Sequence, residues 1–355
     1  MLPYIFFIIV LLISTIFDKT KFEKLTFLIL SLFLLTFSAF RVGGTGLADY
    51  DAYLRLYSKI VNWESVIDPT IHAELGFRLL SFIGNAAGFE GQFIIFSMAL
   101  LAAIPVLWLI NKYSYYPIVS LLFWTPYFLT MNMHSSRISV AVSFGLLFII
   151  SFYESRKLSS VILFLIAVSF HSSAICLFLV FLTCFTYRTL LVLIVLALLF
   201  GLVFNPFFLI ANVFSLIGMD HIAWLIKSYI SSEDYGYPMK LYDPRIILSL
   251  MTTLLIYNIR KSVIHGFDSY IFKVFFVGVF LMIAFSSVTI IAWRLSYFYL
   301  VSCVLVIPLI CKYYNFRFFN SFGHIRMMSV FYSFVYVLYT LPIILGAQPY
   351  RFYFG

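Results

Sequence analysis

The sequence predicts an all-α polytopic membrane protein with roughly 11 to 12 transmembrane helices and two long outer loops. Hydrophobic residues make up 63% of the 355 residues, charged residues only 10%, and the mean hydropathy is +1.06. This composition excludes a soluble globular domain, in which about a quarter of the residues are charged. We therefore expect residues 1–355 to form a single integral membrane domain with no separable soluble module.

The expected membrane spans follow from the apolar stretches of the chain. They lie at residues 2–17, 25–40, 91–110, 116–132, 137–153, 158–170, 172–186, 189–204, 246–259, 268–289, 295–311 and 327–345. The first stretch lacks the basic segment and the small-residue cleavage site of a signal peptide, so we expect a retained helix. The spans 158–170 and 172–186 are short, and we favour two tilted helices over one helix broken at His171.

The distribution of charge predicts the orientation, because basic residues gather in the cytoplasmic loops of membrane proteins. The predicted inner segments hold Lys19, Lys21, Lys24, Lys112, Arg156, Lys157, Arg188, Arg260, Lys261, Lys273, Lys312, Arg317 and Arg326. Only Asp18, Glu23, Glu154 and Asp268 oppose them, so the inner side carries the whole net charge of +9. This placement argues against nucleic acid as a partner and leaves the bilayer as the expected environment.

The two outer loops cover about residues 41–90 and about residues 205–245. The first is rich in Gly, Asp and Tyr and includes an amphipathic segment, Leu75 to Ala87. The second begins with Pro206 to Gly218, which is too short to span and should lie along the interface. Its remainder, Met219 to Asp243, is polar and rich in tyrosine, which suits sugar binding and interface anchoring equally.

The first outer loop opens with the most informative segment, Arg41 to Tyr53. Its closely spaced glycines permit a tight approach to a ligand, and Arg41 could contact phosphate oxygens in a bidentate manner. An arginine snorkelling at a helix end is the simpler interpretation. The Asp-x-Asp pair of Asp49 and Asp51 could hold a divalent cation, or the two carboxylates could simply be solvated.

Two further arginines and a histidine stand at the predicted outer ends of helices. Arg137 begins an apolar span after Asn132 and His134, where the helix dipole and the membrane both disfavour a cation. Arg294 interrupts a hydrophobic stretch and should face protein or a cavity. His171 is either a hydrogen-bonded core residue, or a general base or phosphate ligand. Cys176, Cys184, Cys303 and Cys311 lie inside apolar runs and are expected to be small core residues.

In their order along the chain, these residues resemble the EpsG family of Wzy-type bacterial polysaccharide (O-antigen) polymerases. The matching positions are Arg41, Asp49, Tyr50 and Tyr53, then Glu74, Gly76 and Phe77, then Arg137, then Phe170, His171, Ser173 and Ala174, and finally Arg294, Tyr297, Phe298 and Pro308. Ile138 stands where the family usually has glutamine. The resemblance extends from about residue 1 to about residue 315.

The resemblance implies a membrane glycosyltransferase at the periplasmic face of the bacterial cytoplasmic (inner) membrane. It would polymerise undecaprenyl-pyrophosphate-linked oligosaccharide repeat units into O-antigen or similar surface polysaccharide, and both outer loops would be periplasmic. Donor and acceptor glycans are then the partners, with a chain-length regulator protein as a possible further one. Pyrophosphate is a good leaving group, so we expect no metal and no other cofactor.

The resemblance also assigns roles to the site residues. Binding of pyrophosphate or glycan is expected from Arg41, Arg137, Arg294, Tyr50, Tyr53 and Tyr297. The acceptor hydroxyl would be deprotonated or positioned by one of His171, Asp49 and Glu74. Two other functional classes stay open. One is a flippase for the same lipid-linked oligosaccharide, and the other is a metal-dependent, polyprenyl-phosphate-using glycosyltransferase or a glycan ligase.

Overall fold

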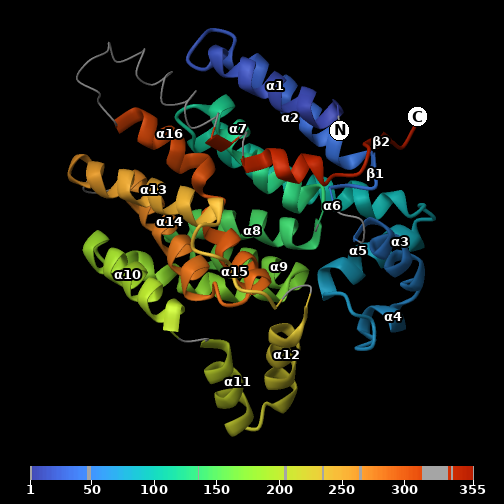
Figure 1. The fold of residues 1–355 in the computed structure, drawn as a ribbon. Coiled ribbons are helices and arrows are strands. Elements are labelled where there is room, and N and C mark those ends of the chain that lie inside the picture. Colours follow the sequence, from blue (N-terminus) through green and yellow to red (C-terminus); the bar gives the residue numbers. More distant parts are fainter. Residues whose placement is uncertain are drawn as a thin grey trace. The chain divides into compact units, whose positions relative to one another are not determined.

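The computed structural model describes residues 2–45, 49–134, 136–203, 206–233, 236–263, 266–313, 335–336 and 339–354. This part of the chain is almost entirely helical, which confirms the all-α prediction. Its one sheet pairs β1 (Arg41–Val42) with β2 (Arg351–Phe352) in antiparallel register. The chain forms two compact units, residues 1–175 with 303–355, and residues 176–302 (Figure 1).

The first unit holds the N-terminal helices, the segments of the first long loop and part of the C-terminal region, where residues 339–345 are also helical. Its helices are α1 (Leu2–Ser14), α2 (Glu23–Ala39), α3 (Asp49–Lys59), α4 (Trp63–Ile67), α5 (Leu75–Ala86), α6 (Gln92–Tyr113), α7 (Pro117–Tyr127), α8 (Ser136–Tyr153), α9 (Lys157–Phe170) and α16 (Cys303–Tyr313). A 3₁₀ turn, η1 (Thr15–Phe17), extends α1, and a π-helical turn, η2 (Phe128–Asn132), follows α7. The amphipathic segment expected from Leu75 to Ala87 is α5.

The second unit holds the remaining helices. They are α10 (Tyr187–Val203), α11 (Pro206–Leu216), α12 (Asp220–Ser231), α13 (Pro244–Ile259), η4 (Arg260–Ser262), α14 (Phe267–Ala284) and α15 (Thr289–Leu300). A 3₁₀ helix, η3 (Ser172–Cys184), begins in the first unit. α9 and η3 are separated at His171, whose backbone is extended (φ −158°, ψ 123°). That the two segments cross the membrane as two tilted helices stays a prediction.

Within the described residues, three helices, α6, α8 and α14, are long and apolar enough to cross a bilayer, and α15 with α16 could make a fourth, broken span. Several other described helices are apolar but only 10 to 17 residues long. The membrane-protein class is therefore confirmed, whereas the number of spans and their orientation stay predictions. The span expected at 327–345 lies mostly outside the described residues.

Two expectations about helices and cysteines were wrong in detail. The helix expected at 295–311 is two helices, α15 and α16, with a break at Val301 and Ser302. α15 starts early because both the backbone N–H and the hydroxyl of Thr289 bind the carbonyl of Tyr237, at 3.1 and 2.8 Å. Cys184 is exposed, whereas the other three cysteines are buried as expected.

Polar contacts join the helices of the first unit. Such contacts matter in a membrane, because the hydrophobic effect contributes little to the association of helices in lipid. Ser143 in α8 donates a hydrogen bond to the carbonyl of Ala102 in α6. The carboxylate of Asp18, which follows η1, accepts the backbone N–H groups of Ile118 and Val119, at 3.0 and 2.9 Å. Asp18 therefore caps the N-terminus of α7 from a distant part of the chain and fixes the first helical hairpin to it.

Candidate functional site

A short strand after α2 positions Arg41. β1 pairs with β2 of the C-terminal segment, and Gln92 at the start of α6 donates to the carbonyls of Ala39 and Arg41, at 3.0 and 3.2 Å. Gln92 also accepts the hydroxyl of Tyr50, at 2.9 Å. Neither Gln92 nor the C-terminal strand was indicated by the sequence, because both act through contacts between segments far apart in the chain.

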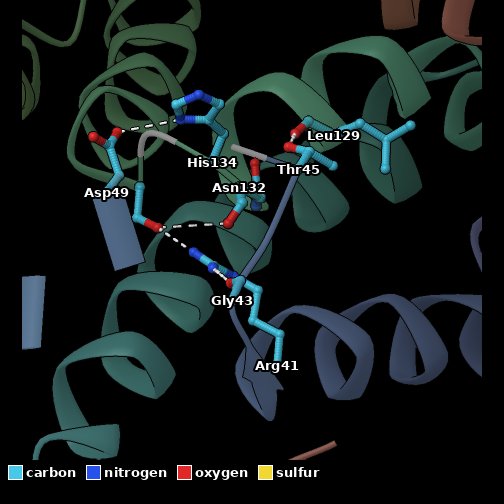
Figure 2. Close-up of polar contacts among 8 residues, drawn as sticks. Arg41, Gly43, Thr45, Asp49, Leu129, Asn132 and His134 are labelled. Atoms are coloured by element: carbon cyan, nitrogen blue, oxygen red, sulfur yellow. Dashed lines mark hydrogen bonds and ion pairs between the residues drawn. The ribbon is translucent and has the colours of Figure 1, made fainter. Parts of the chain in front are cut away.

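The glycines of this segment permit a close approach to other parts of the chain, whereas the approach to a ligand expected from the sequence stays a prediction. Gly43 has φ +80°, a left-handed conformation that favours glycine. A Cβ atom on Gly44 would lie 2.1 Å from the carbonyl oxygen of Met133, which leaves no room for a side chain. Thr45 then binds η2 and the turn after it, through its hydroxyl to Leu129 and its N–H to Met133 (Figure 2).

Arg41 is the most deeply buried charged residue of the site, at 1% exposure. Its guanidinium donates to the carbonyl of Gly43 and to the Ser136 hydroxyl, the latter at 3.0 Å (Figure 2). Among the described residues no carboxylate forms an ion pair with Arg41, and its Nε has no hydrogen-bond partner there. Burial accordingly lowers the pKa of Arg41, opposed by the partial negative charge of nearby groups, Tyr53 foremost. A buried cation without a counterion is costly and is suited to an anionic ligand.

Asp49 and Asp51 occupy the first turn of α3, not a flexible loop, and the helix dipole favours carboxylates there. Residues two apart on a helix do not face each other. Asp49 lies 3.3 Å from Nδ1 of His134 (Figure 2), and both side chains are about one-third exposed. Asp51 instead lines a separate cavity. The metal-binding interpretation of the Asp-x-Asp pair therefore loses its geometric basis.

Arg137 lies at the N-terminus of α8 and forms an ion pair with Glu74, the N-terminal cap position of α5. Its guanidinium also lies over the rings of Tyr53 and Phe77, at 5.7 and 6.0 Å from the centroids. The carboxylate explains how a cation is tolerated beside the positive end of the helix dipole. Glu74 and Arg137, both singled out in the sequence, are thus brought together.

Tyr53 connects the two arginines. Its hydroxyl hydrogen-bonds Arg137, and it also interacts electrostatically with Arg41. Burial raises its pKa to about 12, so the side chain is a neutral phenol. Asp49 likewise acts on both guanidinium groups. Arg41 and Arg137, from distant segments, therefore belong to one cluster with Asp49, Tyr50, Tyr53 and Glu74.

Residues at the end of η2 and at the start of α8 form hydrogen bonds beneath this cluster. Ser136 binds both Arg41 and the carbonyl of Asn132, and Ser139 donates to the Asn132 side chain. π-Helical turns such as η2 are frequent at functional sites because they re-aim the residues that follow. The sequence segment around Asn132 pointed to Arg137. It did not identify Ser136 as the contact to Arg41.

His171 ends α9 close to the start of α5. A Cβ atom on Gly76, two residues after Glu74, would lie 2.9 Å from the carbonyl oxygen of Ser169. The Nδ1 atom of His171 accepts the N–H of Ser173 at 3.2 Å and lies 2.6 Å from its hydroxyl. The neutral ring then carries its proton on Nε2, and His171 lies in the same region of the first unit as Glu74.

Arg294 and Tyr297 belong to the second unit. Arg294 lies within α15 and not at the helix edge that the sequence suggested, because α15 begins at Thr289. Tyr297 is buried and stacks on Trp293, with ring centroids 6.5 Å apart. Arg41 and Arg137 lie in the first unit and Arg294 lies in the second, so a common cavity for the three arginines stays a prediction.

The second unit contains an arginine that the sequence did not single out. Arg245 donates from Nε to Asp243 at 2.7 Å, forms a second contact through Nη2, and lies 4.0 Å over the Trp293 ring. A Pro between Asp and Arg after a tyrosine-rich loop is the only sequence signal for this pair, and it resembles many ordinary helix starts.

Comparison with known protein families matches residues 24–352, nearly the whole chain, to the EpsG family. The match continues well past residue 315, where the sequence resemblance was expected to end, and reaches β2, which pairs with β1 beside Arg41. No significant match exists among curated proteins or among solved structures. The extent of the match, together with the all-helical membrane fold, shows that this chain belongs to the EpsG family, whose members are Wzy-like polysaccharide polymerases.

Proposed function

We propose that the protein polymerises undecaprenyl-pyrophosphate-linked oligosaccharide repeat units at the periplasmic face of the bacterial inner membrane. The product would be O-antigen or a similar surface polysaccharide. The observation that carries the proposal is the cluster in which Arg41 and Arg137 share Tyr53 and Asp49. Glu74 forms an ion pair with Arg137, whereas no carboxylate of the described residues forms an ion pair with Arg41. The Arg41 guanidinium therefore suits an anionic group, and a lipid pyrophosphate is such a group.

In this proposal the arginines bind pyrophosphate and stabilise the charge that develops on it as it leaves. A guanidinium presents five N–H donors in a planar fork. Arg137 uses donors for Glu74 and Tyr53, and Arg41 uses two, for Gly43 and Ser136. The remaining donors of both arginines suit phosphate oxygens in bidentate geometry. The phenols of Tyr50 and Tyr53 hold the two guanidinium groups in place, and we assign Arg294 and Tyr297 to the same substrate.

The acceptor hydroxyl needs a base, and the three sequence candidates differ in their surroundings. Glu74 is engaged with Arg137, which suits it to positioning. Asp49 contacts His134, an arrangement in which a carboxylate holds the Nδ1 proton and leaves Nε2 to accept a proton. We favour the Asp49–His134 pair as the base, with His171 as the alternative.

Substitution of Arg137 tests the function. In cells that carry Arg137→Ala, long-chain polymer should disappear, while a single repeat unit remains on the lipid carrier at the outer leaflet. Arg55→Ala, which removes an exposed arginine of α3 outside the cluster, is the matched control and should keep the normal ladder of chain lengths.

Other outcomes of the same experiment identify the rival functions. A normal ladder in Arg137→Ala at wild-type protein levels would contradict the assignment. Accumulation of the repeat unit on the inner leaflet would indicate a flippase. Glycan transferred to a lipid core without chain growth would indicate a ligase, and loss of activity on chelation would indicate a metal-dependent enzyme.

A further inference from the structure

A cavity of about 250 Å³ lies beside the arginine cluster within the first unit. Three segments enclose it: the β1 strand with Gly43, the first turn of α3, and the C-terminal segment that leads into β2. Its lining residues are Val42, Gly43, Tyr50, Asp51, Gln348, Pro349 and Arg351. Asp51 and Arg351 are exposed, so the cavity can be reached by a ligand.

The lining combines opposite charges, an amide and an aromatic ring. Asp51 supplies a carboxylate acceptor, Arg351 supplies donors, and the Gln348 amide supplies both. The hydroxyl of Tyr50 is already bonded to Gln92, so its contribution to the lining is the ring. One carboxylate and one guanidinium balance, which favours a neutral ligand with many hydroxyl groups over an anion.

The structure holds this cavity open by specific contacts. The pairing of β1 with β2 fixes Arg351 across from Val42, and the Tyr350 hydroxyl donates to the carbonyl of Phe37 at 3.0 Å. A Cβ atom on Gly43 would lie 2.9 Å from Oε1 of Gln348. A glycine at this position, with its positive φ, is therefore what allows Gln348 to lie against the strand.

We propose that this cavity is a saccharide subsite that binds one sugar ring of the glycan substrate. The volume is just below the roughly 300 to 1,000 Å³ of pockets for drug-sized ligands, which suits a single ring. Asp51 and Arg351 bind ring hydroxyls, and Tyr50 offers an apolar face. The Tyr50 ring centroid lies 5.8 Å from the Arg41 guanidinium carbon, so the sugar subsite adjoins the proposed pyrophosphate site.

This inference rests on the proposed function. Two separate probes allow the saccharide subsite and the proposed function to be tested independently. The full-length protein is purified in detergent micelles and titrated in saturation-transfer NMR experiments. The sugar probe is the oligosaccharide released by mild acid from the lipid-linked repeat unit of the same cells. The second probe, inorganic pyrophosphate, is followed by calorimetry and reports on the arginine cluster alone.

The expected result is saturable binding of both probes by the wild-type protein. Asp51→Asn and Arg351→Gln should each weaken sugar binding about tenfold or more and leave pyrophosphate binding unchanged. Arg55→Ala, on the same helix as Asp51, should leave both affinities unchanged. Asp51→Asn preserves the shape of the side chain, and an unaltered melting temperature for it and Arg351→Gln shows that the fold is intact.

Three outcomes would overturn the subsite or the function separately. Wild-type sugar affinity in both Asp51→Asn and Arg351→Gln overturns the subsite. Absence of sugar binding by a wild-type protein that binds pyrophosphate overturns it as well. Sugar binding without pyrophosphate binding leaves the subsite intact and contradicts the proposed role of the arginine cluster.

Discussion

Two arginine clusters, one in each unit, use the same residue types in different ways. In the second unit Arg245 contacts Asp243 through two nitrogen atoms and stacks on Trp293, so its charge is balanced by its own neighbours. In the first unit Arg41 is buried against carbonyl, hydroxyl and aromatic groups, without an ion pair among the described residues. The difference separates an arginine whose charge is balanced within the fold from one that we propose to bind an anion.

The largest effect we expect from this comparison is on activity. Arg41→Met should lower polymerisation about 10³-fold, because it removes a cation from the leaving group. Its melting temperature should stay equal or rise, since a buried charge is replaced by an apolar side chain of similar length. Polymer ladders and thermal unfolding in detergent measure the two effects.

Arg245→Ala should show the reverse pattern. It leaves the partly exposed Asp243 carboxylate without its cation and removes the contact with Trp293, so the protein should lose about 1–2 kcal/mol of stability and keep its polymer ladder. Loss of polymer at wild-type protein levels in Arg245→Ala would break the distinction between the two clusters. Such a loss would indicate that Arg245 also takes part in binding the substrate.

The second prediction sharpens the comparison within α3, where Asp49 and Asp51 face different partners. Asp49→Asn should lower kcat about 100-fold, because the carboxylate that orients His134 is weakened as an acceptor. Asp51→Asn should mainly raise KM, because it contacts a sugar ring that does not react. Initial rates at varied acceptor concentration separate the two. Equal effects of both substitutions on kcat would count against the assignment of Asp49.

The third prediction compares two glycines in the two units. Gly44→Ala should cost about 1–3 kcal/mol of stability and abolish activity, because its Cβ would meet the Met133 carbonyl at 2.1 Å beside Arg41. Gly278→Ala in α14 should destabilise by a similar amount, since its Cβ would lie 2.9 Å from Leu300 N, and retain activity. Activity per folded molecule is the measurement, and equal residual activity would contradict the special role of Gly44.

The smallest expected effect concerns a helix cap away from both clusters. Asp18→Ala should lower stability by about 1–2 kcal/mol, because α7 loses the acceptor for two backbone N–H groups. Asp18→Asn should lose less, since its amide oxygen still accepts a hydrogen bond. Chain length should be normal in both variants, and an altered ladder would indicate that α7 transmits its position to the site.

The sequence alone determined the helical membrane class, and it drew attention to several residues that the structure brings together in the first unit. Long apolar runs with few charges leave the helix as the form that satisfies backbone hydrogen bonds in lipid. The polar His171 between two short apolar runs indicated that the chain has two separate helical segments there. Isolated arginines at the ends of apolar spans drew attention to Arg41 and Arg137 for the same reason, since a cation in that position needs a compensating partner.

Only the tertiary structure decided which partners these are. The pairs Arg137–Glu74 and Asp49–His134, the sharing of Tyr53 and the cover of β1 by β2 each join segments distant in the chain. Hydropathy and residue spacing describe one segment at a time, so they carry no information on contacts between distant segments. The sequence also did not predict that α3 begins at Asp49, which points Asp49 and Asp51 in different directions. The local helix propensity of this segment is weak, and the helix is stabilised mainly by the packing of Tyr50, Tyr53 and Tyr57.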